Sequence, residues 1–434
     1  MKGIANFVSP GHRMFETSVA SFLPSYIVLP FCQADEKEYQ CSLEPGDLVK
    51  EGQELASLNG IISSHGADIH SSVPGKIESI EQCTLVNGNL SFAAKIKTQG
   101  EFSFLGKGKK VFDWNIFAAA TLIEIFKSKG IVNTFSGNSV ALSTQIRECR
   151  LSKDRFVVVR LFDEDQSRYT ESFVSSKHIR EVVTGALIAA KAFDAEGIVF
   201  VLPKKADFSI PSELLEGKLY CTVFADTGKY PCGNVNSLMR LVRKNSKIPE
   251  YKPFYGINHR CLFLDSITCL SIYEGVVLGM PVLSRYVHVN GSCLKSSGMF
   301  KVRLGTRIRD LVEQCGGFFA SPSKIIINGL VCGNAVADME IPVTKDVKSV
   351  TFLSSSELFV QESNPCIRCG KCRAICPEHL VPDMLYKLAA ENYLLPRDIA
   401  STAKICSGCS LCNSVCPSRI SLSQSIALLN QEKI

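Results

Sequence analysis

The sequence predicts a multidomain protein that combines α/β and β domains and ends in an α-helical domain. Three observations predict this class: turn-rich β runs near the N-terminus, a strand–helix–strand pattern in the middle, and two runs of four cysteines near the C-terminus. With 434 residues the chain is long enough for about three or four domains. We predict four domains, with the boundaries 1–105, 106–250, 251–354 and 355–434.

The first domain is predicted to be a small β-sandwich. In residues 44–80, short β-type runs alternate with turn residues such as Gly46 and Gly52. This pattern resembles the biotinyl/lipoyl-type β-sandwich. Carrier versions of that fold have a lysine on the central hairpin, whereas residues 63–72 here contain none. We therefore expect a structural or docking unit and not a carrier.

The second domain is predicted to be a Rossmann-like βαβ domain. Residues 155–162 and 197–203 are short continuous apolar runs, which are typical of buried parallel strands, and residues 180–193 between them have the pattern of a helix. The third domain is β-rich from residue 297 to 353, with a short helix starting near Thr306. Its pattern is similar to a β-grasp module of the SLBB type, preceded by a connection.

The last domain carries two cysteine runs that share one spacing, C-x2-C-x2-C-x3-C-P, closed by Pro377 and Pro417. Three thiolates at successive steps of three can bind successive corners of an iron–sulfur cube. The alternative is a pair of structural zinc sites, but zinc motifs normally use two separated C-x2-C pairs. The spacing therefore favours a ferredoxin-like domain with two [4Fe–4S] clusters.

In motifs of this kind the fourth cysteine of each run binds the other cluster. One predicted ligand set is Cys366, Cys369, Cys372 and Cys416, and the other is Cys376, Cys406, Cys409 and Cys412. The remaining cysteines are scattered, and most of them are expected to be small buried apolar side chains. No catalytic residue and no other cofactor-binding residue is predicted.

Composition and charge exclude several classes of function. The formal net charge is +6, but no basic stripe interleaved with aromatic residues appears, so we expect no nucleic-acid partner. No long uninterrupted apolar stretch predicts a membrane-spanning helix. The N-terminal segment meets charged residues, Pro and Gly before an apolar run can form, which argues against a secretory signal. A cytosolic or peripheral protein is expected.

The order of these parts resembles the RnfC subunit of the ion-translocating Rnf electron-transport complex, which is related to NqrA. KYPCGN at residues 229–234 is similar to the KYPQGG turn of that family. Further positions that match the family pattern are Thr268, Gly279, Pro281, Arg285 and Gly291.

The resemblance implies an electron-transfer subunit that relays electrons through its clusters to a membrane-bound complex coupling electron transfer to ion translocation. It implies a peripheral position on the cytoplasmic side of the inner membrane, bound to the other membrane subunits of the complex. Attachment is expected through these protein partners, because no strongly basic amphipathic helix is evident.

Two segments depart from the family pattern. The glycine-rich flavin and NADH loop of the family, of the form GLGGAGFP, is NTFSGNSV at residues 133–140 here. The family signature NGAECEP is RLFDEDQ at residues 160–166, so Arg160 and Leu161 replace asparagine and glycine. These bulkier residues predict loss of the FMN and NADH pocket, and with it of NADH oxidation by this chain itself. The expected donor is therefore a small soluble one-electron carrier such as a ferredoxin or flavodoxin.

Two alternative functions are also compatible with parts of the sequence. The first is a soluble RnfC-like flavin and iron–sulfur reductase, for example a corrinoid reductase, which would need an intact flavin loop. The second is a non-catalytic iron–sulfur scaffold. The electron-transfer subunit is the interpretation that the sequence favours.

Overall fold

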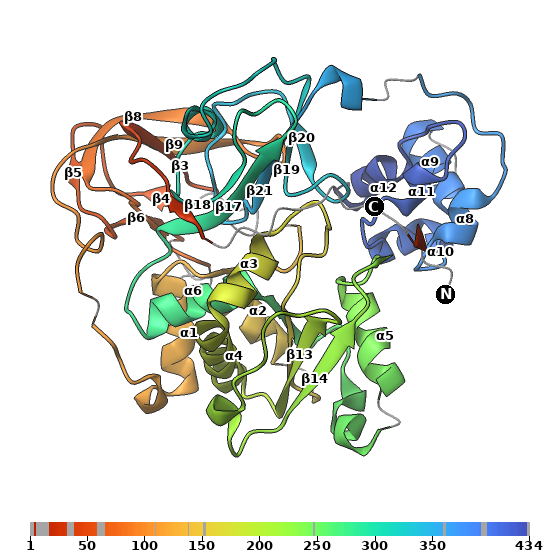
Figure 1. Cartoon of the computed structure of the whole chain (residues 1–434), viewed down its shortest axis with the longest axis horizontal. Helices are drawn as coiled ribbons and strands as arrows, with labels where there is room; N and C mark the ends of the chain where they lie inside the picture. The colour runs from red at the N-terminus through yellow and green to blue at the C-terminus, as the bar shows by residue number, and fades with distance from the viewer. Residues whose placement is uncertain are drawn as a thin grey trace.

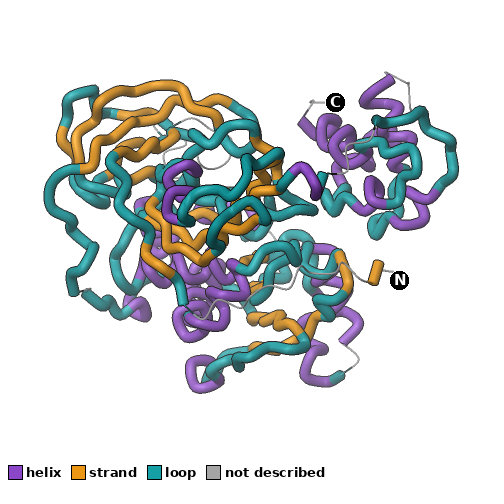
Figure 2. Tube along the Cα trace, turned by 45° about the horizontal axis from the view of Figure 1, so that its top comes forward, coloured by secondary structure: helices purple, strands orange, loops and turns teal. Residues whose placement is uncertain are grey.

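The computed structural model describes residues 4–5, 17–32, 39–58, 66–108, 110–137, 139–150, 153–245, 248–358, 362–391 and 397–431. Figure 1 shows three regions in one large body and a separate helical region beside it. The N-terminal β domain and the β-grasp module lie above the central α/β domain, and the C-terminal helices lie to the right. Figure 2 shows that these C-terminal residues contain helices and loops but no strand among those described.

The N-terminal domain is a β-sandwich, as predicted. One sheet has the strand order β3 (Tyr26–Pro30), β9 (Leu90–Thr98), β8 (Gly75–Thr84) and β5 (Leu48–Val49). The other has the order β4 (Gln40–Cys41), β6 (Glu54–Ser57) and β7 (Ile69–His70). Alternate residues of the long strands point inward, so Ile27, Leu29, Ile77 and Ile96 have no exposed surface.

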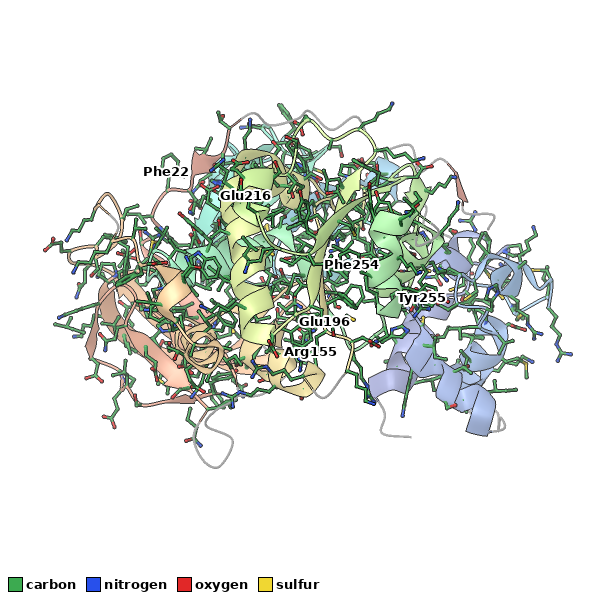
Figure 3. The ribbon with its side chains drawn as sticks, turned by 90° about the horizontal axis from the view of Figure 1, so that it is seen from below. Phe22, Arg155, Glu196, Glu216, Phe254 and Tyr255 are labelled. Carbon is green, nitrogen blue, oxygen red and sulfur yellow. The ribbon has the colours of Figure 1, made fainter. Side chains whose placement is uncertain are left out.

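The central domain contains a four-stranded parallel sheet. Its strand order is β14 (Tyr220–Ala225), β13 (Gly197–Pro203), β12 (Phe156–Arg160) and β16 (Leu262–Asp265). The inner strands β12 and β13 are almost continuous apolar runs because helices cover both faces of the sheet there, whereas the edge strand β14 alternates buried and more exposed residues. On one face lie α1 (Ala119–Ser128), α4 (Ile179–Phe193) and α6 (Ser266–Val276). On the other lie α5 (Val235–Asn245) and the 3-10 segment Pro249–Gly256, whose Phe254 lies beside the strands in Figure 3.

Residues 251–283 form part of this central domain, whereas the sequence pattern placed them in the connection before the β-grasp module. β16 pairs in parallel with β12, from Leu262 opposite Val157 to Asp265 opposite Arg160. α6 then packs closely on α4, where a Cβ on Gly185 would lie 1.9 Å from the carbonyl oxygen of Cys269. The central domain therefore extends to about residue 283, just before the first strand of the β-grasp module.

The β-grasp module has a six-stranded sheet. Its helix, α7 (Ile308–Gln314), begins close to the predicted position and packs on the sheet through Ile308 and Leu311. The strand order is β2 (Val19–Ala20), β18 (Gly298–Arg303), β17 (Ser284–Gly291), β21 (Ser349–Leu353), β19 (Lys324–Ile327) and β20 (Asn334–Val336).

The remaining elements are short. The central domain also contains α2 (Leu142–Cys149), α3 (Thr170–Lys177) and the two-stranded sheets β1 (Ile4–Ala5) with β15 (Lys229–Tyr230) and β10 (Val132–Asn133) with β11 (Val140–Ala141). The C-terminal helices are α8 (Lys371–Ile375), α9 (Pro382–Glu391), α10 (Arg397–Ser401), α11 (Leu411–Ser414) and α12 (Leu422–Gln431).

Candidate metal centre

The two cysteine runs follow the same backbone path. In the first run Arg368, Gly370 and His379 have φ values of 54°, 71° and 55°. In the second run Gly408, Ser410 and Arg419, at the corresponding positions, have φ values of 67°, 56° and 54°. Positive φ is uncommon for residues other than glycine, so this agreement reflects one shared conformation. A short helix follows in each run, α8 in the first and α11 in the second.

The eight cysteines surround two small cavities. Within the described parts of the chain, no three Cys, His, Asp or Glu side chains are grouped as ligands of a single metal ion. The first cavity is lined by Cys366, Cys369, Cys372 and Cys416. The second cavity is lined by Cys376, Cys406, Cys409 and Cys412. Each cavity thus takes three cysteines from one run and one from the other, which is the crossed pattern expected from the spacing. We call these sets the first and second quartets.

The thiols are partly withdrawn from water by apolar neighbours. Ile420 and Leu422 line the first cavity, and Leu380, Leu411 and Ile426 line the second. Burial raises the pKa of Cys372 in the first quartet and of three thiols in the second, that of Cys412 to about 12. Such thiols ionise at neutral pH only when a positive ion shares the cavity, because a bound metal deprotonates its thiol ligands.

The two quartets differ in their surroundings. The second packs on the rest of the molecule, where Cys409 and Leu411 contact Tyr230, whose hydroxyl lies 3.0 Å from the Sγ of Cys332. The guanidinium of Arg240 in α5 also donates to the carbonyl of Pro377 at 3.1 Å. The first quartet reaches the surface instead, since Cys369 is exposed and the side chain of Ile367 is 68% exposed.

The carboxyl edge of the central sheet is a second candidate site. The chain moves from β12 to β13 and β14 on one side, and β16 lies on the other side of β12. Ligands of open α/β sheets bind beyond the carboxyl ends of the strands where the strand order reverses in this way. Here the last residues of the two strands are Arg160 and Asp265, and both are completely buried.

Arg160 fills this position with a buried ion pair. Its guanidinium donates to both carboxylate oxygens of Glu171 at 2.9 and 3.0 Å. It also donates to the carbonyl oxygens of Gly233 at 2.8 Å and Phe135 at 3.1 Å. The same guanidinium lies 4.2 Å from the centroid of the Phe135 ring. The side chain that replaces the asparagine of the RnfC pattern is therefore packed and hydrogen-bonded on all sides.

Lys348 of the β-grasp module completes the network. Its amine donates to Glu171 and Asp265 at 2.7 Å each and to the carbonyl oxygen of Thr134 at 2.6 Å. Burial alone would raise the pKa of Asp265, but the charge and hydrogen bond of Lys348, followed by Arg160, hold that pKa below its usual value. We call Arg160, Glu171, Asp265 and Lys348 the buried ion network.

The residues at this edge do not fit a bound FMN. A flavin phosphate or ring needs free backbone N–H groups and a close approach to the loop. The N–H of Thr134 instead donates to the hydroxyl of Thr268 at 3.0 Å, and the N–H of Phe135 donates to the side chain of Asn133 at 3.0 Å. The Phe135 ring is buried against Phe263, at a centroid distance of 5.7 Å. A cleft of about 620 Å³ remains beside this loop, between Phe135, Glu164 and Asn234 on one side and Lys404 and Cys406 on the other.

Sequence reasoning singled out Arg160 as a replacement but missed Glu171, Asp265 and Lys348. No pattern marks these residues, because Lys348 comes from another domain and reaches Glu171 only through the tertiary fold.

Two segments of the chain match known domain families. The RnfC barrel sandwich hybrid domain matches residues 16–101, and the SLBB domain matches residues 286–334. The predicted resemblance to RnfC is thereby confirmed, and with it the β-sandwich and the β-grasp module. Among the helices that the structure describes, none is long and apolar enough to cross a membrane.

Individual relatives carry matching names. The chain is 26% identical over 388 residues to the C subunit of the proton-translocating ferredoxin:NAD(+) oxidoreductase complex of Clostridium ljungdahlii, covering 86% of this chain and 82% of that protein. It is 23% identical to the C subunit of the Na(+)-translocating ferredoxin:NAD(+) oxidoreductase complex of Acetobacterium woodii, covering 85% and 82%. The match to a solved NAD+-reducing [NiFe]-hydrogenase covers 74% of this chain and 61% of the hydrogenase chain, with 12% sequence identity and a TM-score of 0.44.

Proposed function

We propose that this chain is the electron-transfer subunit of a membrane-bound, ion-translocating oxidoreductase complex of the Rnf type. The observation that carries the proposal is the pair of crossed cysteine quartets, on a chain whose relatives are named as the C subunits of such complexes. The electrons pass through two [4Fe–4S] clusters. One is held by Cys366, Cys369, Cys372 and Cys416, and the other by Cys376, Cys406, Cys409 and Cys412.

The quartets support clusters of this kind in two ways. Four thiols that surround a cavity suit a cube, since each thiolate binds a different iron and the four need not meet at one point. Thiolates are also the soft ligands that iron–sulfur clusters prefer. When bound, such clusters accept and release single electrons. The chain itself supplies the eight thiolates and the apolar side chains that exclude water, among them Leu380, Leu411 and Leu422.

The proposed electron donor is a small one-electron carrier such as a ferredoxin or flavodoxin. Hydride transfer from NADH needs a two-electron acceptor such as a flavin, and the buried ion network occupies the carboxyl edge of the sheet, where ligands of such sheets bind. At the surface of the first quartet, Arg368 and Lys371 are exposed next to Ile367 and Cys369. These cations would attract an acidic carrier. The buried ion network also argues against the alternative of a soluble flavin reductase, because that enzyme would need a flavin site.

We further propose that the chain is peripheral, bound to the membrane subunits of the complex on the cytoplasmic side of the inner membrane. The proposal starts from the names of its relatives, which are subunits of ion-translocating complexes. Washing membranes at high salt or alkaline pH should then release the protein without detergent.

Iron analysis of anaerobically purified protein tests the central claim. Two [4Fe–4S] clusters require about eight iron atoms per chain and a reducible visible absorption band. Stoichiometric zinc without iron-dependent absorption would show that the quartets hold zinc. Clusters that stay oxidised when they are mixed with reduced ferredoxin would favour a scaffold role.

A further inference from the structure

The connection between the N-terminal β-sandwich and α1 exposes several large apolar side chains. Val111 and Ile116 are each 74% exposed, Leu105 is 48% exposed and Phe112 is 44% exposed. Single exposed apolar residues are ordinary on protein surfaces, but a group of them on one short connection marks an interaction surface.

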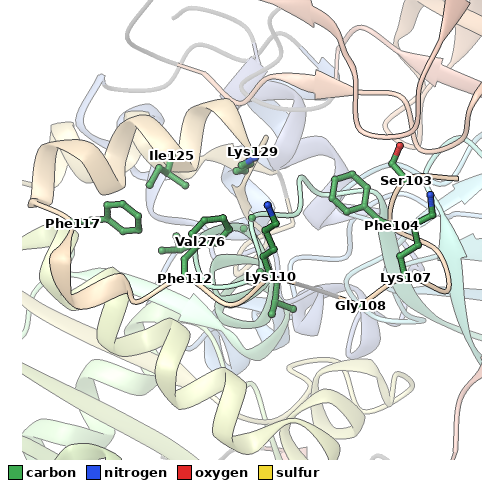
Figure 4. Close-up of a pocket in the computed structure, with 13 residues that line it drawn as sticks. Ser103, Phe104, Lys107, Gly108, Lys110, Phe112, Phe117, Ile125, Lys129 and Val276 are labelled. Carbon is green, nitrogen blue, oxygen red and sulfur yellow. The ribbon is translucent and has the colours of Figure 1, made fainter.

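A cavity of about 380 Å³ opens beside this connection (Figure 4). Its apolar lining includes Phe104, Phe112, Phe117, Ile125 and Val276. Lys107, Lys110 and Lys129 also line it and add positive charge to an otherwise apolar pocket. The pocket therefore offers apolar walls and several ammonium groups in one place.

Positive charge exceeds negative charge along this stretch. The sequence GKGKK contains Lys107, Lys109 and Lys110, of which Lys109 lies outside the described residues. Two carboxylates are close in sequence. Glu101 pairs with Lys107 at 2.6 Å, with both side chains at least half exposed, and Asp113 accepts from the backbone N–H of Asn115. Lys110 has no ion-pair partner among the residues that the structure describes.

We propose that residues 103–108 and 110–117 are a membrane-contact surface that binds an anionic lipid bilayer. The apolar side chains enter the interface between headgroups and acyl chains, and the lysines lie near lipid phosphates. Lysines next to Val, Leu, Ile and Phe are typical of segments that lie on membranes. Aromatic residues are common in both kinds of surface, but the cores of protein interfaces are depleted in lysine.

This inference goes beyond the proposed function, which requires attachment only through other subunits. No basic amphipathic helix is evident in the sequence, so its pattern suggested protein partners alone. The structure presents the same chemistry on a loop, where no helical periodicity reveals it. Contact with lipid would hold the chain against the membrane independently of its clusters.

Sedimentation with vesicles tests the proposal on the full-length protein. We expect the wild type to bind vesicles of phosphatidylcholine and phosphatidylglycerol at about 3:1, to bind pure phosphatidylcholine vesicles much less, and to dissociate as salt rises. Each lysine near an anionic surface contributes about 1 kcal/mol, so Lys107→Glu with Lys110→Glu should weaken binding at least about tenfold. Val111→Ser with Ile116→Ser should weaken it on the same vesicles.

The matched control is the double variant Lys218→Glu with Leu219→Ser. It changes an exposed lysine and a neighbouring leucine, 43% exposed, in another part of the molecule. This variant should bind vesicles like the wild type. Iron content and circular dichroism of every variant separate loss of this surface from loss of the fold or clusters. The proposal is overturned if the wild type does not bind anionic vesicles. Binding only to membranes that contain its partner subunits would overturn it too, because attachment would then depend on protein alone. Equal binding by the variants overturns it as well.

Discussion

Lys345 is a fully buried lysine at the meeting point of three domains. Its amine donates to the backbone carbonyl of Asp68 in the N-terminal β-sandwich at 3.0 Å, and it lies close to Gly130 of the central domain. Burial, followed by the charge of Arg285, lowers the pKa of Lys345 from 10.5 to about 7, while Asp68 opposes the shift. An amine in this position is neutral over part of the physiological pH range.

The lowered pKa predicts a pH dependence of stability. Between pH 7 and 10.5 the unfolded chain binds a proton at Lys345 that the folded chain has released, so folding becomes more favourable as pH rises. The free energy of unfolding of the wild type, relative to Lys345→Met, should rise by up to about 1.4 kcal/mol per pH unit in this window and stay constant below it. Denaturant unfolding at several pH values measures this difference. Parallel curves for the two proteins would contradict the prediction.

The buried ion network predicts a large cost for removing its cation. Lys348→Met leaves Glu171 and Asp265 without the amine that now bonds to both carboxylates. Breaking a buried pair by removing one partner costs about 3–5 kcal/mol, which should lower the melting temperature clearly. The control is Arg180→Met, which breaks an exposed pair with Glu213 and should change stability by at most about 1 kcal/mol. Equal melting temperatures for both variants would show that the network contributes nothing.

At the scale of single residues, the sequence pattern singled out the eight cysteines, which the structure gathers around two cavities, but not the buried ion network. The four cysteines of each run are close together in the sequence, so their spacing can be recognised as a motif. Arg160, Glu171, Asp265 and Lys348 meet only because β12, α3, β16 and the segment before β21 come together in the fold. No rule of periodicity links residues that are so far apart in sequence.

The crossing of the cysteine runs predicts which substitutions behave alike. Cys376→Ser should remove the cluster of the second quartet, like Cys409→Ser, although Cys376 belongs to the first run. Cys369→Ser should remove the other cluster and weaken its neighbour, since the runs share ligands. Each variant should lose about four of about eight iron atoms. The electron paramagnetic resonance spectra of Cys376→Ser and Cys409→Ser should resemble each other and differ from that of Cys369→Ser.

Cys83→Ser is the control for this series, because Cys83 is partly exposed and lies in β8 of the N-terminal β-sandwich, outside both quartets. It should keep the full iron content. If Cys376→Ser and Cys372→Ser instead gave the same spectrum, each run would hold its own cluster.

At the scale of elements, long apolar runs were predicted well and short strands were not. β12, β13 and α4 lie where the hydrophobic pattern put them, since each buries a continuous face. β16 is a short strand that pairs with β12, although β13 and β14 of the same sheet come between them in the sequence. No local sequence pattern therefore assigned β16 to this sheet. The boundary at residue 250 was misplaced for this reason.

For the whole molecule we predict that purified protein binds no FMN. The loop N–H groups of Thr134 and Phe135 are already hydrogen-bonded, and Arg160 occupies the carboxyl edge of the sheet. Fluorescence titration with FMN should show no saturation at stoichiometric concentrations, and NADH should not bleach the clusters. Reduced ferredoxin should bleach them in the same preparation, which serves as the control. Tight FMN binding followed by reduction with NADH would contradict the prediction.

The crossed quartets also determine the order in which the protein can mature during synthesis. The second quartet is complete once Cys412 has left the ribosome, whereas the first quartet begins earlier but waits for Cys416. The site that packs against Tyr230 can therefore be finished before the site that faces solvent. A ribosome that stops between the two runs releases a chain with neither quartet complete, so a truncated product would contain no full set of four thiols.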